Sequence, residues 1–130
     1  MHSDDPIINI GVNASLAHAY LDDHKLFVEQ LTSILQSTMP HAIKVKWKGG
    51  LFAEKQIAKV TIELDGVEHI LELAKSGAYI SQRARVVGGI RLKTESVTMK
   101  EWFASLTALI SEAAENHQAA QEAFTQITGN

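Results

Sequence analysis

The chain of 130 residues has a formal net charge of −3, 45% hydrophobic and 21% charged residues, and no cysteine. This length is typical of one domain with one core, and this composition argues against a disordered or fibrous chain. The lack of cysteine excludes disulfides, thiol catalysis and thiolate metal sites, and it is compatible with a reducing compartment.

The net charge divides unevenly along the chain. Residues 1–40 carry one Lys or Arg and five Asp or Glu (net −4), residues 41–100 carry eleven and six (net +5), and residues 101–130 carry none and four (net −4), which sums to −3. A basic middle between acidic ends indicates either a polyanion site or a sheet and helices of complementary charge. We favour the second explanation.

The N-terminal sequence MHSDDPIINI has no basic segment followed by a long apolar run. No apolar stretch elsewhere approaches the ~20 residues that span a bilayer. These features predict a cytoplasmic protein that does not enter a membrane. We expect residues 1–12 to form a mobile arm or a short edge strand, and residues 13–130 to form a single α+β domain.

The first predicted helix begins after Asn13, which is a suitable N-cap. Apolar residues then recur near the 3.6-residue period of a helix: Leu16, Tyr20, Phe27, Leu31, Ile34 and Leu35. Asp22 and Asp23 interrupt this apolar face, so we expect a break into two helical segments there. The helix should end by Met39, because Pro40 disfavours helical geometry in the residue before it.

The segment HAIKVKWKGG, residues 41–50, has the alternation of a strand. Its three lysines, Lys44, Lys46 and Lys48, would share one face, while Trp47 would point to the other. We expect the lysines to form the solvated face of a sheet.

A β-hairpin follows over residues 59–64 and 67–73. The dipeptide Asp65-Gly66 between these alternating segments favours the positive φ angles of a tight hairpin turn. We expect His69 to lie on the core side as a hydrogen-bonded interior histidine. The predicted register pairs Ile62 with His69, Val60 with Leu71, and Lys59 with Glu72.

A fourth strand is predicted over residues 78–87, after a turn at Lys75-Ser76-Gly77. Gly88-Gly89 interrupts its alternation and indicates a bulge or bend, after which residues 90–93 resume the strand. The sequence therefore predicts a meander of four antiparallel strands.

The C-terminal helix is predicted to begin at a capping box formed by Thr98 and Glu101. Its apolar stripe comprises Trp102, Leu106, Leu109, Ala113, Ala120, Phe124 and Ile127. A continuous helix to Ile127 would be ~43 Å long, whereas a six-residue strand is only ~20 Å long. The excess must fold back near Asn116 or pair with a second copy of the chain.

We favour pairing, which would cover the apolar stripe in a homodimer. Phe124 would be the anchor of the interface, and small neighbouring residues would let the helices approach closely. The predicted interface residues are Ala113, Ala120, Phe124 and Ile127. The predicted architecture is thus two-layer α+β: an N-terminal helix, a four-stranded antiparallel meander, and a long or paired C-terminal helix packed on one sheet face.

Recognised catalytic and cofactor motifs are missing from the sequence, including phosphate-binding loops, dinucleotide fingerprints, zinc helices and nucleophile elbows. His18 and Asp22 are spaced to share a helix face, but a metal would need a third ligand such as His24. Glu63 and Glu68 are predicted to lie opposite each other and to be solvated. We therefore expect no catalytic residue, no metal site and no cofactor.

These observations predict a non-enzymatic protein–protein interaction or adaptor module, whose partners are a second copy of itself and another protein. The alternative is a nucleic-acid-binding protein with a basic sheet surface. Base-stacking aromatics are expected among the cations of such a surface, yet Trp47 is predicted to point away from the lysines. The residues of this alternative surface are Lys44, Lys46, Lys48, Arg83, Arg85, Arg91 and Lys93.

Overall fold

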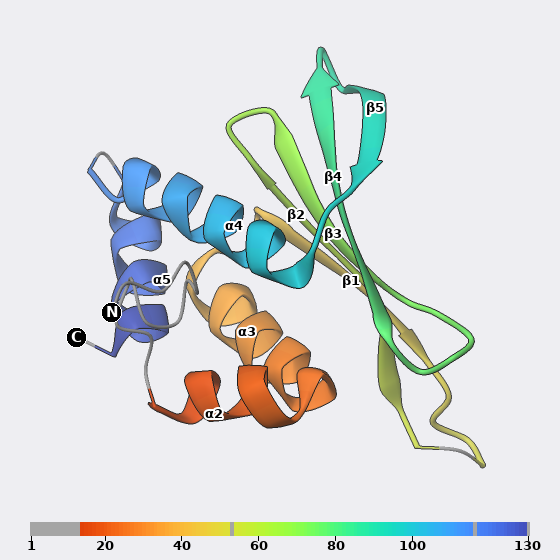
Figure 1. Cartoon of the computed structure of the whole chain (residues 1–130). Coiled ribbons are helices and arrows are strands. Elements are labelled where there is room, and N and C mark those ends of the chain that lie inside the picture. Colours follow the sequence, from red (N-terminus) through yellow and green to blue (C-terminus); the bar gives the residue numbers. More distant parts are fainter. Residues whose placement is uncertain (1–13, 53, 116, 130) are drawn as a thin grey trace, which may run out of the picture.

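The computed structural model describes residues 14–52, 54–115 and 117–129 (Figure 1). The arm or edge strand expected for residues 1–12, and the N-cap expected at Asn13, lie outside these residues. In chain order the elements are α2 (Ala14–Asp22), α3 (His24–Thr38), β1 (Ile43–Lys48), β2 (Gln56–Leu64), β3 (Val67–Leu73), β4 (Tyr79–Val87), β5 (Ile90–Ser96), α4 (Met99–Ala113) and α5 (Gln118–Thr128). In the described part of the chain, no helix is both long and apolar enough to cross a bilayer.

The break predicted at Asp22 and Asp23 separates α2 from α3. Asp23 has an extended backbone, and its side chain accepts a hydrogen bond of 3.2 Å from the backbone N–H of Leu26. This bond satisfies one of the unpaired N–H groups at the start of α3. Helix α3 ends at Thr38 with Met39 as its C-cap, which confirms the predicted end.

The β2–β3 hairpin has the predicted register. Asp65 and Gly66 both adopt positive φ angles, 50° and 73°, as a type I′ turn requires. Ile62 pairs with His69, Val60 with Leu71, and Lys59 with Glu72. Val60 and Ile62 are buried in the core. Because side chains alternate along a strand, Lys59 points to the other face.

The sheet has five strands in the order β1-β2-β3-β4-β5, so the prediction of four strands is wrong. Gly88 and Gly89 adopt φ angles of 58° and 79°, and the residues on either side, Val87 and Ile90, pair with each other. The diglycine is therefore a two-residue hairpin turn of the same kind as Asp65-Gly66, because both of its positions need positive φ. It is not a bulge or bend within one strand.

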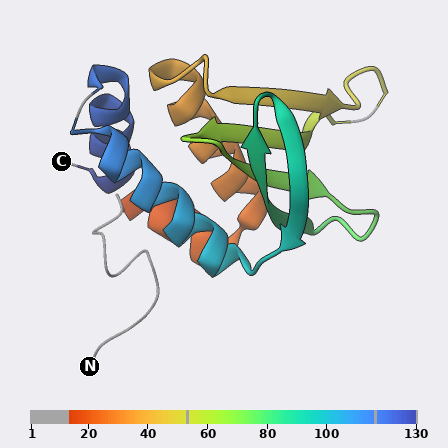
Figure 2. The same cartoon turned by 90° about the horizontal axis from the view of Figure 1, so that it is seen from above.

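The helices lie on one side of the sheet, which gives the predicted two-layer α+β arrangement (Figures 1 and 2). Helix α3 contacts β1 and β2, and α4 contacts β4. The core between the layers includes Phe27 from α3, Ile62 from β2, and Trp102 and Phe103 from α4, all of them fully buried.

The C-terminal helix folds back instead of continuing. Helices α4 and α5 are separate, and α5 packs against both α3 and α4. Ala120 and Ile127 are completely buried within the single chain, and Phe124 packs against the core. The fold-back expected as the alternative near Asn116 thus buries most of the apolar stripe within one chain, while Leu109 and Ala113 stay partly exposed.

Candidate functional site

Two adjoining pockets follow one side of α4. The first, of about 580 Å³, lies between the end of α3, the β2–β3 turn, the end of α4 and the start of α5. The second, of about 510 Å³, lies between α4 and the β4–β5 hairpin. Asp65 and Leu109 line both pockets, so the two meet there. We call them together the α4 groove. Leu64, Ala113, Ala119 and Ala120 are among the residues that line the first pocket. The second is lined by residues that include Arg83, Arg85, Lys93, Glu95, Ser105 and Ala108.

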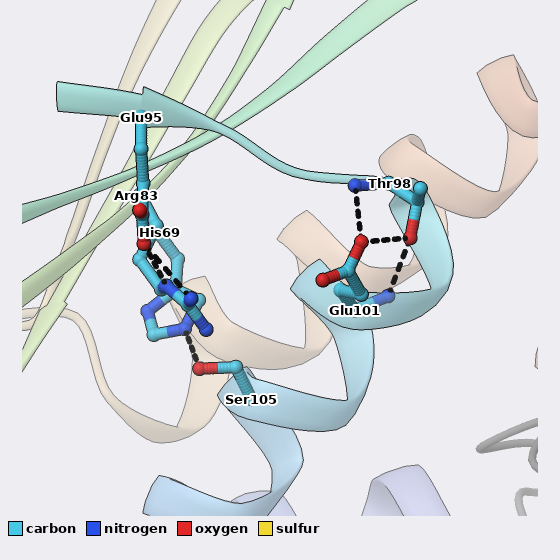
Figure 3. Close-up of polar contacts among 6 residues, drawn as sticks. All are labelled: His69, Arg83, Glu95, Thr98, Glu101 and Ser105. Atoms are coloured by element: carbon cyan, nitrogen blue, oxygen red, sulfur yellow. Dashed lines mark hydrogen bonds and ion pairs between the residues drawn. The ribbon is translucent and has the colours of Figure 1, made fainter.

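The predicted capping box places α4 directly after β5 (Figure 3). Thr98 Oγ1 accepts a hydrogen bond of 3.0 Å from the backbone N–H of Glu101, and Glu101 Oε1 accepts one of 3.2 Å from the backbone N–H of Thr98. Hydrogen bonds from the Thr98 side chain and backbone lower the pKa of the Glu101 carboxyl, because they favour its charged form. The capping box thereby sets the start of α4, and Ser105, Ala108 and Leu109 further along this helix line the groove.

The Lys and Arg side chains that line the groove all lie in its second pocket: Arg83, Arg85 and Lys93. Arg83 is paired, since its Nη2 atom lies 2.9 Å from Glu95 Oε1. Arg85 and Lys93 are exposed, and neither forms an ion pair within the described part of the chain. With Asp65 and Glu95 as its acidic residues, this pocket has a formal charge of 3 − 2 = +1. Two unpaired cations make it a suitable place for an anionic group.

His69 lies beside Arg83 and Ser105 (Figure 3), two residues that line the second pocket. It is opposite Arg83 in the register of β3 and β4, and its Nε2 atom lies 2.8 Å from Ser105 Oγ. Its ring meets Trp102 edge-on, with 5.9 Å between the ring centroids. Burial and then the positive charge of Arg83 lower the pKa of His69 from 6.5 to about 4. His69 is therefore neutral at pH 7, as the hydrogen-bonded interior histidine that the sequence predicts.

The Ser105–His69 contact has the distance expected between a nucleophile and its base, but it lacks the basicity and the orienting third group of such a pair. A histidine whose pKa is about 4 is a weak base, and a catalytic base works best with a pKa near the operating pH. The Nδ1 atom of His69 has no hydrogen-bond partner among the described residues, so no third group orients the ring. We read this pair as a structural contact between β3 and α4.

Exposed apolar side chains gather on the β4–β5 hairpin, which projects beyond α4 in Figure 1. Val87, Ile90 and Leu92 are 57%, 66% and 58% exposed. The β4–β5 ladder shifts register between Ala84 and Val86, and beyond this shift Val87 pairs with Ile90. Val87 follows Arg85 by two residues along β4, so the alternation of that strand places Val87 and its partner Ile90 on the sheet face that carries Arg85. The open end of the groove thus combines cations with an apolar surface, a combination found where proteins bind partners.

The seven cations of the predicted polyanion surface do not share one face. On the face away from the helices lie Lys44, Lys46, Lys48 and Arg91. On the helix-facing side, in the groove, lie Arg83, Arg85 and Lys93. Arg91 is further neutralised by an ion pair with Glu68. The sheet separates the two groups, so a single nucleic-acid surface cannot use all seven residues.

The predicted carboxylate pair and the possible metal ligands lie outside the groove. Glu63 and Glu68 lie opposite each other as predicted, but Glu68 is only 14% exposed because Arg91 covers it, so the expected solvation is wrong for that residue. His18 Nδ1 lies 3.1 Å from Asp22 Oδ2 on the surface of α2. Across the described ranges, no three His, Asp or Glu side chains are arranged to hold a metal ion.

The four residues predicted as a dimer interface now have other neighbours. Ala113 and Ala120 line the first pocket of the groove, Ile127 lies in the core, and Phe124 packs against it. Ala113 and Ala120 are thus the predicted site residues that the structure brings to the groove from its C-terminal helices.

Sequence reasoning did not find the groove residues Asp65, Ser105 and Ala108. Asp65 was visible only as a turn residue, and Ser105 and Ala108 lie beside the apolar stripe of α4 without any motif. No family model, no curated protein and no solved structure matches this chain.

Proposed function

We propose that this chain is a non-enzymatic protein-binding module that holds a segment of another protein in the α4 groove. The observation that carries the proposal is the continuity of the groove with an exposed apolar hairpin. The two pockets meet at Asp65 and Leu109, and the second opens beside the hairpin that exposes Val87 and Ile90.

The shape of this surface favours an elongated ligand. Each pocket alone has the size of a small-molecule site, roughly 300–1,000 Å³. Together they pass along α4 from the start of α5 to the β4–β5 hairpin, which is a path suited to a peptide segment. Large exposed apolar residues gathered on one hairpin are also costly in water unless a partner covers them.

The chemistry inside the groove supports binding over catalysis. The hydroxyl group of Ser105 contacts His69, a histidine that is buried and weakly basic. The Arg83 guanidinium next to that histidine is already paired with Glu95. Neither arrangement supplies an activated nucleophile. Arg83 and Ser105 instead line the second pocket, where a bound segment can lie against them.

Arginine substitutions at exposed alanines of the groove test the proposal. Ala108→Arg would fill the second pocket and Ala119→Arg the first, because both residues are exposed and line these pockets. Matched controls are Ala104→Arg in α4 and Gln121→Arg in α5, which are exposed positions of the same helices outside both pockets.

The measurement is affinity capture from the cell of origin with the full chain, followed by calorimetric titration of the captured protein. We expect the wild type and both control variants to bind it alike. The two groove variants should bind about tenfold more weakly or worse, since a blocked pocket excludes buried contacts. Equal binding by all four variants would contradict the assignment of the site to the groove.

A further inference from the structure

Building on the proposed function, we infer that the bound segment is apolar where it lies in the first pocket and acidic where it reaches Arg85 and Lys93. The two ends of such a segment differ in chemistry, so the segment would lie in the groove in one direction.

Positive charge is distributed unevenly along the groove. The first pocket has no Lys or Arg in its lining and is walled largely by apolar residues, among them Leu64, Leu109, Ala113 and Ala120. Every Lys and Arg of the groove lies at the opposite end, beside the β4–β5 hairpin. An anionic group on a bound segment therefore has Lys and Arg partners at one end of the groove only.

The three cations of the second pocket differ in whether they have an ion-pair partner. Arg83 is held by Glu95 through its Nε and Nη2 atoms, at 3.3 and 2.9 Å, so it is not available to a ligand without breaking that pair. Arg85 and Lys93 carry no such partner in the described part of the chain. Their side chains are the ones left to meet carboxylates from outside the chain.

The neighbourhood of the two cations excludes a purely electrostatic partner. Val87 and Ile90 lie on the same face of the hairpin as Arg85 and are exposed. A segment that placed only carboxylates here would leave these side chains in water. Aspartate or glutamate interleaved with apolar residues satisfies both, so we commit to such a segment of a partner protein.

The test is a selection of random peptides displayed on phage against the immobilised full chain. The enriched peptides are then resynthesised and titrated against four variants. The first is the charge reversal Arg85→Glu with Lys93→Glu, and the second is its neutral form, Arg85→Gln with Lys93→Gln, which guards against misfolding of the reversed variant. The third is Lys44→Glu with Lys46→Glu, the same change of net charge on the opposite sheet face. The fourth is Ala108→Arg.

We expect the enriched peptides to carry apolar residues at one end and Asp or Glu at the other. Their binding should weaken about tenfold on charge reversal and less on neutralisation, because exposed ion pairs contribute modestly each. The control on the opposite face should bind as the wild type does, and raising the salt concentration should weaken only the binding that depends on Arg85 and Lys93.

Two failures are distinguishable. In the first, Ala108→Arg abolishes binding of the enriched peptides, but these peptides carry no acidic residues and bind the charge-reversed variant as tightly as the wild type. That result would overturn this inference and leave the proposed function standing. In the second, the peptides bind Ala108→Arg as tightly as the wild type as well, which would overturn both this inference and the proposed function.

Other occupants of the groove give their own signals. A dimer in sedimentation equilibrium that Ala108→Arg dissociates would identify a second copy as the occupant. Tighter peptide binding on Asp4→Lys with Asp5→Lys would identify the chain's own N-terminal residues as a competitor. Either result would overturn the assignment to a separate partner.

Discussion

The Nε2 atom of His69 lies 2.8 Å from the Oγ atom of Ser105, and this hydrogen bond ties the central strand β3 to α4. It joins the sheet to the helix that forms one wall of the α4 groove. Because the histidine is completely buried, the contact also makes the fold sensitive to protons.

Acidification should destabilise the protein through His69. Its pKa is about 4 in the folded chain, against 6.5 for an unperturbed histidine, so between these values the unfolded chain binds more protons. The stabilisation is complete above about pH 6.5 and is lost as the pH falls toward the folded pKa, at up to ~1.4 kcal/mol per pH unit for one group. Urea unfolding at several pH values in this window measures it. His69→Gln, which does not titrate, should have a visibly flatter pH profile, and parallel profiles would refute the assignment.

Removing the cap of α4 should destabilise the chain. Thr98→Ala deletes the hydroxyl that accepts from the Glu101 backbone N–H, and such caps contribute about 0.5–2 kcal/mol. Thr98→Ser keeps a hydroxyl and should retain most of the free energy of unfolding. If chemical denaturation finds Thr98→Ala and Thr98→Ser equally stable, the capping box does not set the start of this helix.

Truncating Ile127 should weaken the fold of the single chain. This residue is completely buried, so Ile127→Ala should cost about 2–5 kcal/mol of unfolding free energy. Glu122→Ala, at an exposed position of the same helix, should have little effect. Sedimentation equilibrium completes the test. If Ile127→Ala keeps the stability of the wild type but changes a dimer into a monomer, the apolar stripe is an interface between two chains.

Replacing Lys44, Lys46 and Lys48 together by Gln should leave stability within ~0.5 kcal/mol of the wild type, because exposed charges contribute little. The same variant should bind groove peptides normally, since these lysines lie on the far face of the sheet. A gel shift with random duplex DNA at several salt concentrations distinguishes nucleic-acid binding from the proposed protein binding. Salt-sensitive binding that the triple substitution abolishes would favour that alternative.

Local chemistry made much of the fold predictable. The register of the β2–β3 hairpin follows from the alternation of residues around Asp65-Gly66, and the start of α4 follows from Thr98 and Glu101. The fifth strand was predictable by the same rule, because Gly88-Gly89 also suits a turn with two positive φ angles. A diglycine fits both a bulge and a turn, however, and only the pairing of Val87 with Ile90 distinguishes them.

The sequence by itself determined the α+β class, the cap of α4 and the core face of the hairpin, because each depends on residues close together in the chain. The tertiary structure decided what covers the apolar stripe of the C-terminal helix and where the cations gather. Folding back buries Ile127 against the core without a second copy, since burial of apolar surface is non-directional and is satisfied equally within or between chains. The α4 groove exists only because the β2–β3 turn and the β4–β5 hairpin meet α4 in space. The sheet places Arg85 and Arg91 on opposite faces, so cations that are close together in the sequence are separated in the folded chain.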